Sequence, residues 1–184
     1  MDNTKINKKV LEKMKKFDLY QGMDKLNDVI MMQDEVDDRF VENDLIELLS
    51  CTMIYHQIVE CMIHSLLIHY EYIKALEKNS YMKSKYRNIK GFGRLKNEIE
   101  KLNFGDFFEN KKEFLKECGE LNKLRNKLAH EIIGNNHGKL IAEINKVKTV
   151  YHNIQSIYQT TAVKIFNYIH KQIDDFSILE LDDI

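Results

Sequence analysis

Residues 121–131, with the sequence LNKLRNKLAHE, bring together side chains that could bind an anion and move a proton. Three leucines at helical spacing predict an amphipathic helix, on which Asn126 and His130 lie one turn apart. Arg125 lies about 140° from His130 around the axis, but its long side chain can reach the same surface. Histidine suits acid–base chemistry near neutral pH, and arginine presents a planar, permanently charged fork to phosphate oxygens. The alternative is that Arg125 and Asn126 are solvated and that His130 stabilises the C-terminal end of the helix.

Glu60 is a fourth candidate, because it is a carboxylate within an apolar stretch of the chain. A buried carboxylate is costly unless it is paired, and Arg125 from a neighbouring helix could pair with it. Glu60 also shares a helical row with His56 and His64, so ordinary contacts along that helix are an open alternative. A metal site on this row is a further alternative, although the HExxH pattern is absent and no fourth ligand is evident. We therefore expect no metal and no cofactor.

The segment 78–96 is a candidate RNA-binding segment. It contains seven lysines and arginines and no acidic residue, and Tyr81, Tyr86 and Phe92 are interleaved with them. Cations neutralise phosphates, and aromatic rings can stack on unpaired bases. The alternative is a solvated, mobile loop. The residues that we expect to contact RNA are Lys83, Lys85, Arg87, Lys90 and Arg94.

Long helices must position these groups, because the chain has no proline and seven glycines. Helical periodicity predicts helices over residues 4–17, 23–39, 43–77, 94–102, 110–131 and about 140–168. The helix 43–77 is apolar over most of its circumference, which indicates burial in a bundle core and at a subunit interface. The last helix carries a heptad seam, and we expect it to pack antiparallel against 43–77.

The predicted fold class is all-α, an antiparallel bundle of about five to six helices. Its length favours one domain over residues 1–184. Within it, residues 1–40 would form N-terminal helices, 43–175 the bundle core, and 176–184 an acidic, frayed tail. The segment GNNHG, 134–138, is expected to be a turn, with Gly134 as a helix cap.

Composition indicates a cytoplasmic protein with no membrane span. No run of about 18 apolar residues occurs, and the charged N-terminus lacks the apolar core of a signal peptide. The three cysteines share no CxxC spacing, which favours reduced thiols over disulfides or zinc. The formal net charge is −1, so any nucleic-acid binding must come from a local patch.

The sequence RNKLAH at 125–130 resembles the motif of the HEPN superfamily (higher eukaryotes and prokaryotes nucleotide-binding domains): an arginine, a polar residue, three spacers and a histidine. The motif lies on the penultimate long helix, just before a turn, and the glycine-led segment GFGRLKNEIEKLN, 91–103, precedes it, as in that family. The resemblance covers roughly residues 43–170. HEPN domains are helical and usually dimeric, and many are metal-independent ribonucleases of toxin–antitoxin, abortive-infection and CRISPR-associated systems.

The resemblance implies an endoribonuclease in which the 2′-hydroxyl of RNA attacks its own phosphate. His130 would serve acid–base catalysis, Arg125 would stabilise the phosphorane, and Asn126 would orient His130 or hold a phosphate oxygen. Glu60 would hold Arg125. Two motifs would meet across a homodimer, since the reaction benefits from both an acid and a base. The implied partners are RNA, a second copy of the chain, and an antitoxin or another defence protein.

One alternative function is a non-catalytic interaction module built on the same bundle, such as an antitoxin subunit or a mannitol-repressor-like regulator. The near-neutral net charge favours it. One position departs from some HEPN toxins, which carry a tyrosine two residues after the histidine that a partner nucleotidyltransferase modifies. That position is Ile132 here, so adenylylation is not expected there.

Overall fold

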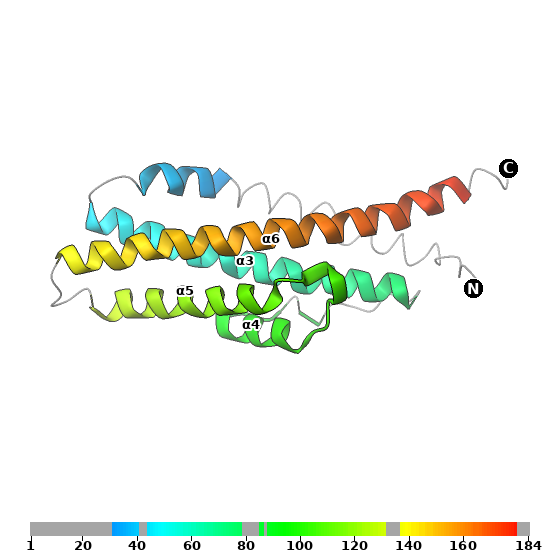
Figure 1. Cartoon of the computed structure of the whole chain (residues 1–184), viewed down its shortest axis with the longest axis horizontal. Coiled ribbons are helices and arrows are strands. Elements are labelled where there is room, and N and C mark those ends of the chain that lie inside the picture. Colours follow the sequence, from blue (N-terminus) through cyan, green and yellow to red (C-terminus); the bar gives the residue numbers. More distant parts are fainter. Residues whose placement is uncertain (1–30, 41–43, 79–84, 87, 132–136, 180–184) are drawn as a thin grey trace.

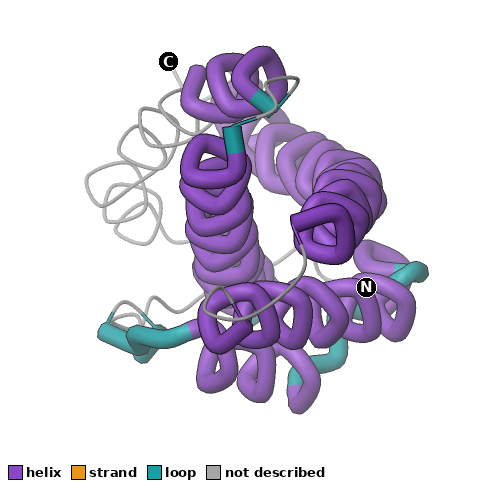
Figure 2. Tube along the Cα trace, turned by 90° about the vertical axis from the view of Figure 1, so that its left-hand side faces the viewer, coloured by secondary structure: helices purple, strands orange, loops and turns teal. Residues whose placement is uncertain are grey.

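The fold is a bundle of α-helices, and the prediction of an all-α protein is confirmed (Figure 1). The computed structural model describes residues 31–40, 44–78, 85–86, 88–131 and 137–179. Within these ranges there is no strand, and helices and loops make up the whole of the tube in Figure 2. Residues 31–39 are helical. The further elements are α3 (Leu45–Glu77), α4 (Phe92–Lys101), the 3-10 helix η1 (Gly105–Phe108), α5 (Lys111–Glu131) and α6 (His137–Leu179).

The central helix is α3, which the sequence predicts over almost the same residues. Asp44 caps its N-terminus, because the carboxylate accepts hydrogen bonds from the backbone N–H groups of Ile46 and Glu47. Helices α4, α5 and α6 of the same chain all pack against α3. This packing accounts for the buried side chains of α3, whereas Ile46 on the same helix is 77% exposed, so the expected subunit interface stays a prediction.

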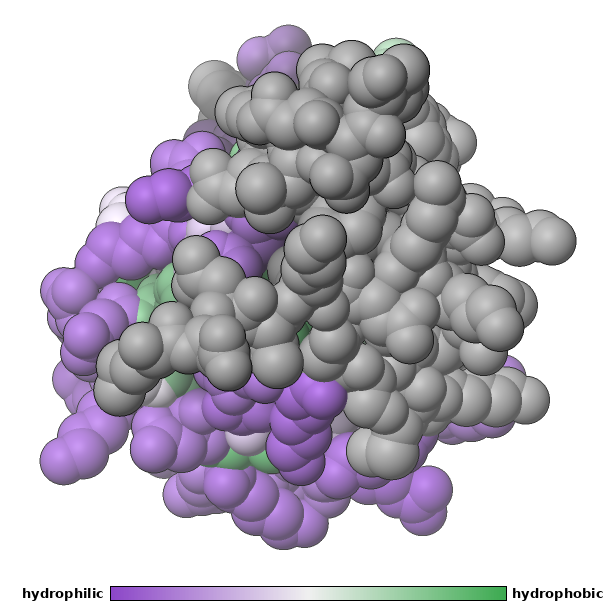
Figure 3. All heavy atoms as spheres, turned by 90° about the vertical axis from the view of Figure 1, so that its right-hand side faces the viewer, coloured by the Kyte–Doolittle hydropathy of each residue, from purple (hydrophilic) through white to green (hydrophobic). Residues whose placement is uncertain are grey.

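By length and composition, α3 could also span a membrane, a possibility that counting consecutive apolar residues did not reveal. Half of its most apolar window is buried inside the bundle, however, as is common for the core helix of a folded domain. On the face shown in Figure 3, the described surface is mainly hydrophilic.

Helices α3 and α6 run parallel, and the expectation that they pack antiparallel is wrong. The ring of Tyr55 stacks on that of Tyr151 with centroids 4.1 Å apart, and the hydroxyl of Tyr158 donates to Ser65 at 3.3 Å. Residue numbers therefore rise together along both helices, which Figure 1 shows running in the same direction. The heptad seam on α6 is buried as expected, but a seam carries no information on the direction of its partner.

Helix α5 runs antiparallel to α6. Lys127 contacts Glu143 at 3.3 Å, whereas Lys164 contacts Glu109 at 2.6 Å near the other end. The chain therefore reverses between α3 and α5 and again between α5 and α6, which makes α3 and α6 parallel. Helix α4 lies against both α3 and α5, at the return between them.

Several predicted boundaries move. Helix α6 begins at His137, inside the predicted turn 134–138, and continues to Leu179, so residues 176–179 of the tail that we expected to fray are helical. Of the predicted helix 23–39, residues 31–39 are described and are helical. The predicted helix 4–17 lies outside the described residues, as do Gly134 and Ile132.

Candidate functional site

The motif helix α5 divides its side chains between the core and the surface. Its leucines at 121, 124 and 128 are buried, as their spacing predicts. Arg125 is half-buried on the side that faces α3, whereas Asn126 and His130 are exposed. The three motif residues thus share a helix but have different surroundings.

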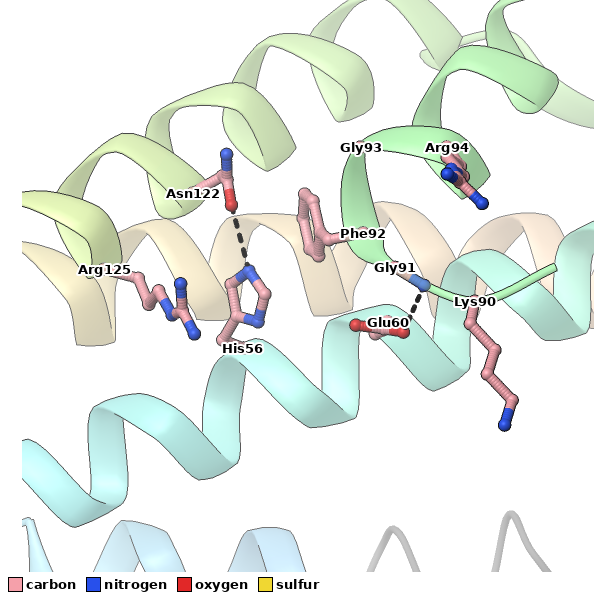
Figure 4. A pocket seen from close by; sticks show the side chains of 9 residues that line it. All are labelled: His56, Glu60, Lys90, Gly91, Phe92, Gly93, Arg94, Asn122 and Arg125. Carbon is pink, nitrogen blue, oxygen red and sulfur yellow. Dashed lines mark hydrogen bonds between the residues drawn. The ribbon is translucent and has the colours of Figure 1, made fainter. Parts of the chain in front are cut away.

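An open pocket of about 420 Å³ lies where α3, the start of α4 and α5 meet (Figure 4). Arg125 belongs to this pocket, but Asn126 and His130 do not line it. Its lining consists of His56 and Glu60 from α3, residues 90–94 at the start of α4, and Asn122 and Arg125 from α5.

The Arg125 guanidinium is held by its neighbour in sequence. Its Nη1 donates a hydrogen bond to Oδ1 of Asn126 at 2.9 Å. Its Nε is buried and has no hydrogen-bond partner among the described residues. In this structure Asn126 therefore contacts Arg125 and not His130; the other expected role, to hold a phosphate oxygen, stays a prediction.

Glu60 lies in the pocket but does not pair with Arg125. Its Oε1 accepts a hydrogen bond from the backbone N–H of Gly91 at 3.2 Å, and the described residues provide no ion pair for it. Gly91 precedes α4 with φ of 94°, a conformation that favours glycine and that aims this N–H at Glu60. The expected Glu60–Arg125 pair is thus replaced by a contact with the backbone.

The row His56–Glu60–His64 does not converge on one point. Nε2 of His56 contacts Asn122 at 3.2 Å, whereas Nε2 of His64 contacts the backbone carbonyl of Tyr86 at 3.1 Å. Glu60 turns to Gly91. In the described part of the chain, no three His, Cys, Asp or Glu side chains are placed to hold one metal ion.

Two further residues line the pocket: His56, which the sequence offered only as a neighbour of Glu60 or a metal ligand, and Asn122, which the sequence did not single out. The His56 imidazole is half-buried and stacks on the Phe92 ring, with centroids 4.4 Å apart and 27° between the planes. Burial lowers the pKa of His56, and the charge of Arg125 lowers it too, although the Asn122 hydrogen bond and Glu60 act in the opposite sense. The sequence holds one signal for the pair: Asn122 lies three residues before Arg125, on the same helical row.

The basic segment contributes to the pocket in part. Lys90 and Arg94 line it, whereas Lys85 is exposed and lies over the Tyr86 ring at 4.7 Å. Lys83 and Arg87 lie outside the described residues. The expectation of base stacking is wrong for two of the three aromatic residues, because Tyr86 is 1% exposed and Phe92 5%. Tyr81 lies outside the described residues.

The pocket suits an anion. Three cations and one carboxylate line it, and that carboxylate already accepts a backbone hydrogen bond. The N-terminus of α4 opens into it without a side-chain cap, so the positive end of the helix dipole adds to these charges. Beside Gly91 and Gly93 the space is open, which allows a ligand close to the backbone.

No family model, curated protein or solved structure matches this chain. The resemblance to HEPN domains therefore rests on the RNKLAH motif, the segment before it and the order of the helices.

Proposed function

We propose that the protein is a metal-independent endoribonuclease of the HEPN type. The observation that carries this proposal is that Arg125, the first residue of the motif, lines an open cationic pocket together with Lys90 and Arg94. These cations come from two separate segments, so the fold gathers them at one place. A pocket of this charge suits the phosphodiester backbone of RNA.

In the proposed reaction the 2′-hydroxyl of RNA attacks the adjacent phosphorus, and the products are a 2′,3′-cyclic phosphate and a 5′-hydroxyl. Arg125 stabilises the negative charge that develops on the phosphorane oxygens. Asn126 fixes the guanidinium through the hydrogen bond to its Oδ1. His130 transfers a proton, since its exposed imidazole can reach an RNA strand that lies across α5.

We further propose a homodimer that acts on RNA in toxin–antitoxin or antiviral defence, as the resemblance implies, and that lies in the cytoplasm, as the spacing of its cysteines favours. His130 lies outside the pocket that Arg125 of the same chain lines, so a two-fold arrangement could bring the pocket of one chain to the histidine of the second. An antitoxin or another defence protein would then control the assembled site.

The direct test incubates total RNA with the wild type and with the variants Arg125→Ala and His130→Ala in the presence of EDTA. Lys123→Ala is a matched control, because Lys123 lies on the same helix with its side chain 80% exposed and outside the pocket. We expect cleavage by the wild type and by Lys123→Ala and its loss in both motif variants. Equal RNA profiles for all four proteins would contradict the proposal.

A second candidate function is a non-catalytic module that binds a phosphate-bearing ligand in the same pocket. The exposed position of His130, outside the pocket, favours this function, because binding alone does not require an acid or a base there. Under this alternative, Arg125→Ala abolishes RNA binding, and the wild type leaves bound RNA intact.

A further inference from the structure

We propose that His56 is a second acid–base residue of the site, and that Asn122 positions it to act as the general base toward the 2′-hydroxyl. This inference rests on the proposed ribonuclease function and deepens it. The RNKLAH motif contains one histidine, whereas the reaction benefits from both an acid and a base, so a second proton-transfer residue is needed.

The position of His56 is the first argument. It lies on α3, and its side chain lines the same pocket as the Arg125 guanidinium from α5 (Figure 4). The stacked ring of Phe92 supports one face of the imidazole, and Phe92 is itself buried. Contacts from α4 and α5 thus fix a half-buried imidazole at the wall of a pocket that suits phosphate.

The hydrogen bond to Asn122 is the second argument, because it determines the tautomer. Oδ1 of Asn122 is a carbonyl oxygen and accepts, so Nε2 of neutral His56 carries the proton and donates it across 3.2 Å. Nδ1 then holds a lone pair, and it has no hydrogen-bond partner among the described residues. A base whose other nitrogen is held by a third group is the usual arrangement in acid–base sites.

The charges around the imidazole are the third argument. Arg125 on α5, Arg94 on α4 and Lys90 just before α4 are positive, and Glu60 on α3 is negative. Burial is the largest influence and lowers the pKa of His56. The imidazole is therefore neutral at physiological pH, which is the form that can accept a proton.

The proposed step balances without any further reactant. Nδ1 of His56 takes the proton of the 2′-hydroxyl while O2′ bonds to phosphorus. The bond from phosphorus to O5′ breaks, and O5′ takes a proton from the imidazolium of His130. Arg125 binds the non-bridging oxygens throughout. The reverse transfers, in a later step or through solvent, return both histidines to their starting states.

The test compares RNA cleavage by the wild type, His56→Gln and His64→Gln. His64 is the matched control, because it is a half-buried histidine on α3 that does not line the pocket. We expect kcat to fall by about 10²- to 10⁴-fold in His56→Gln and to change little in His64→Gln. Wild-type kcat in His56→Gln would overturn the proposal for His56 and leave the ribonuclease function intact.

A second variant, Asn122→Asp, guards against a purely structural effect of His56→Gln. An aspartate keeps the acceptor and adds a negative charge beside Nε2, so the pKa of His56 rises. A general base is active when unprotonated, and so the acid limb of the kcat/KM profile moves to higher pH, by about one unit. An unmoved acid limb would overturn the assignment, because a residue that only supports the fold does not set that limb.

Nitrogen NMR of the imidazoles gives a readout that does not need activity. We expect His56 to be neutral at pH 7 with the proton on Nε2, and its Nδ1 signal to shift when a 2′-O-methyl RNA oligonucleotide, which cannot be cleaved, binds. A proton on Nδ1, or no shift on binding, would overturn the proposal. Absence of cleavage by the wild type, in contrast, would overturn the ribonuclease function and the role of His56 with it.

Discussion

At the scale of single residues, the site depends on how one arginine is held. Asn126 accepts a hydrogen bond from Nη1 of Arg125, and the guanidinium lines the pocket, so its other terminal N–H donors remain for a ligand. Arginine and lysine are not interchangeable here, because the planar fork, and not the charge alone, matches two phosphate oxygens.

If the planar guanidinium is required, Arg125→Lys should behave much like Arg125→Ala. We expect both to lower kcat by about 10²- to 10³-fold, the range found when a donor to a developing oxyanion is removed. The measurement is cleavage of a defined single-stranded RNA, with Lys123→Ala as the control on α5. A wild-type kcat in Arg125→Lys would show that the positive charge alone is sufficient and that the planar guanidinium has no role.

A second residue-scale prediction concerns stability and pH. Burial lowers the pKa of His69 on α3 to about 4. The unfolded chain therefore takes up a proton near pH 6.5, before the folded one does, so the free energy of unfolding is highest above that pH and falls as pH drops toward 4. The loss is roughly 2 to 3 kcal/mol over this window, by the usual linkage relation.

The measurement for His69 is urea denaturation of the wild type and of His69→Gln at pH 7 and pH 4.5. Other groups titrate in both proteins, so the difference between the two pH dependences isolates His69. We expect a clearly smaller loss on acidification in the variant. An equal loss of stability in both proteins would show that folding does not lower the pKa of His69.

At the scale of the elements, the start of α4 controls the shape of the pocket. Gly91 has φ of 94° and donates its N–H to Glu60, whereas Gly93, two residues later, lies within the helix without a positive φ. An added Cβ meets nothing within 4 Å at either glycine. Backbone conformation, and not a steric clash, therefore distinguishes the two positions.

We accordingly predict that Gly91→Ala lowers the free energy of unfolding by about 1 to 3 kcal/mol and weakens RNA binding, because it strains the turn that aims the N–H at Glu60. Gly93→Ala is the matched control for stability and should be neutral or slightly stabilising, since alanine suits a helix better. Denaturant melts of both variants provide the check, and an RNA titration of Gly91→Ala follows. Equal free energies of unfolding for the two variants would contradict the assigned strain at Gly91.

Much of the element scale could be predicted from the sequence. The spacing of Leu121, Leu124 and Leu128 predicts both α5 and its buried side, and the unbroken apolar pattern before Glu77 predicts α3. The relation between helices could not be predicted in the same way. Periodicity describes each helix about its own axis, and it contains neither the direction of α6 beside α3 nor the register of α5 on α3.

The same limit explains what the sequence missed in the site. His56 and Asn122 lie 66 residues apart, and their contact depends on the register between α3 and α5. The burial of Tyr86 and Phe92 could not be predicted either. A basic segment with aromatic residues has the same composition whether its rings face RNA or the core. Arg125 could be identified as a candidate site residue from its type and spacing. Its hydrogen bond to Asn126 depends on the side-chain rotamers, which the sequence does not specify.

At the scale of the whole molecule, we propose that two chains combine to form the site. The proposal rests on the position of His130, which lies outside the pocket that Arg125 of the same chain lines. A second copy of the chain is the simplest source of a histidine that approaches this pocket from outside.

This proposal predicts that mixing Arg125→Ala with His130→Ala restores cleavage. If Arg125 of one chain works with His130 of the other, each mixed dimer carries one intact site, and about a quarter of wild-type activity returns after subunit exchange. Sedimentation analysis checks that the proteins are dimers. A dimer whose mixed variants stay inactive would place Arg125 and His130 of each site in the same chain.

Attack by the 2′-hydroxyl is tested by cleavage of a single-stranded RNA in EDTA, compared with the same RNA carrying a 2′-deoxy nucleotide at the cleaved position. We expect a 2′,3′-cyclic phosphate and a 5′-hydroxyl from the first RNA and no cleavage at the modified position of the second. Cleavage of both RNAs, or cleavage that EDTA abolishes, would contradict attack by the 2′-hydroxyl at a metal-independent site.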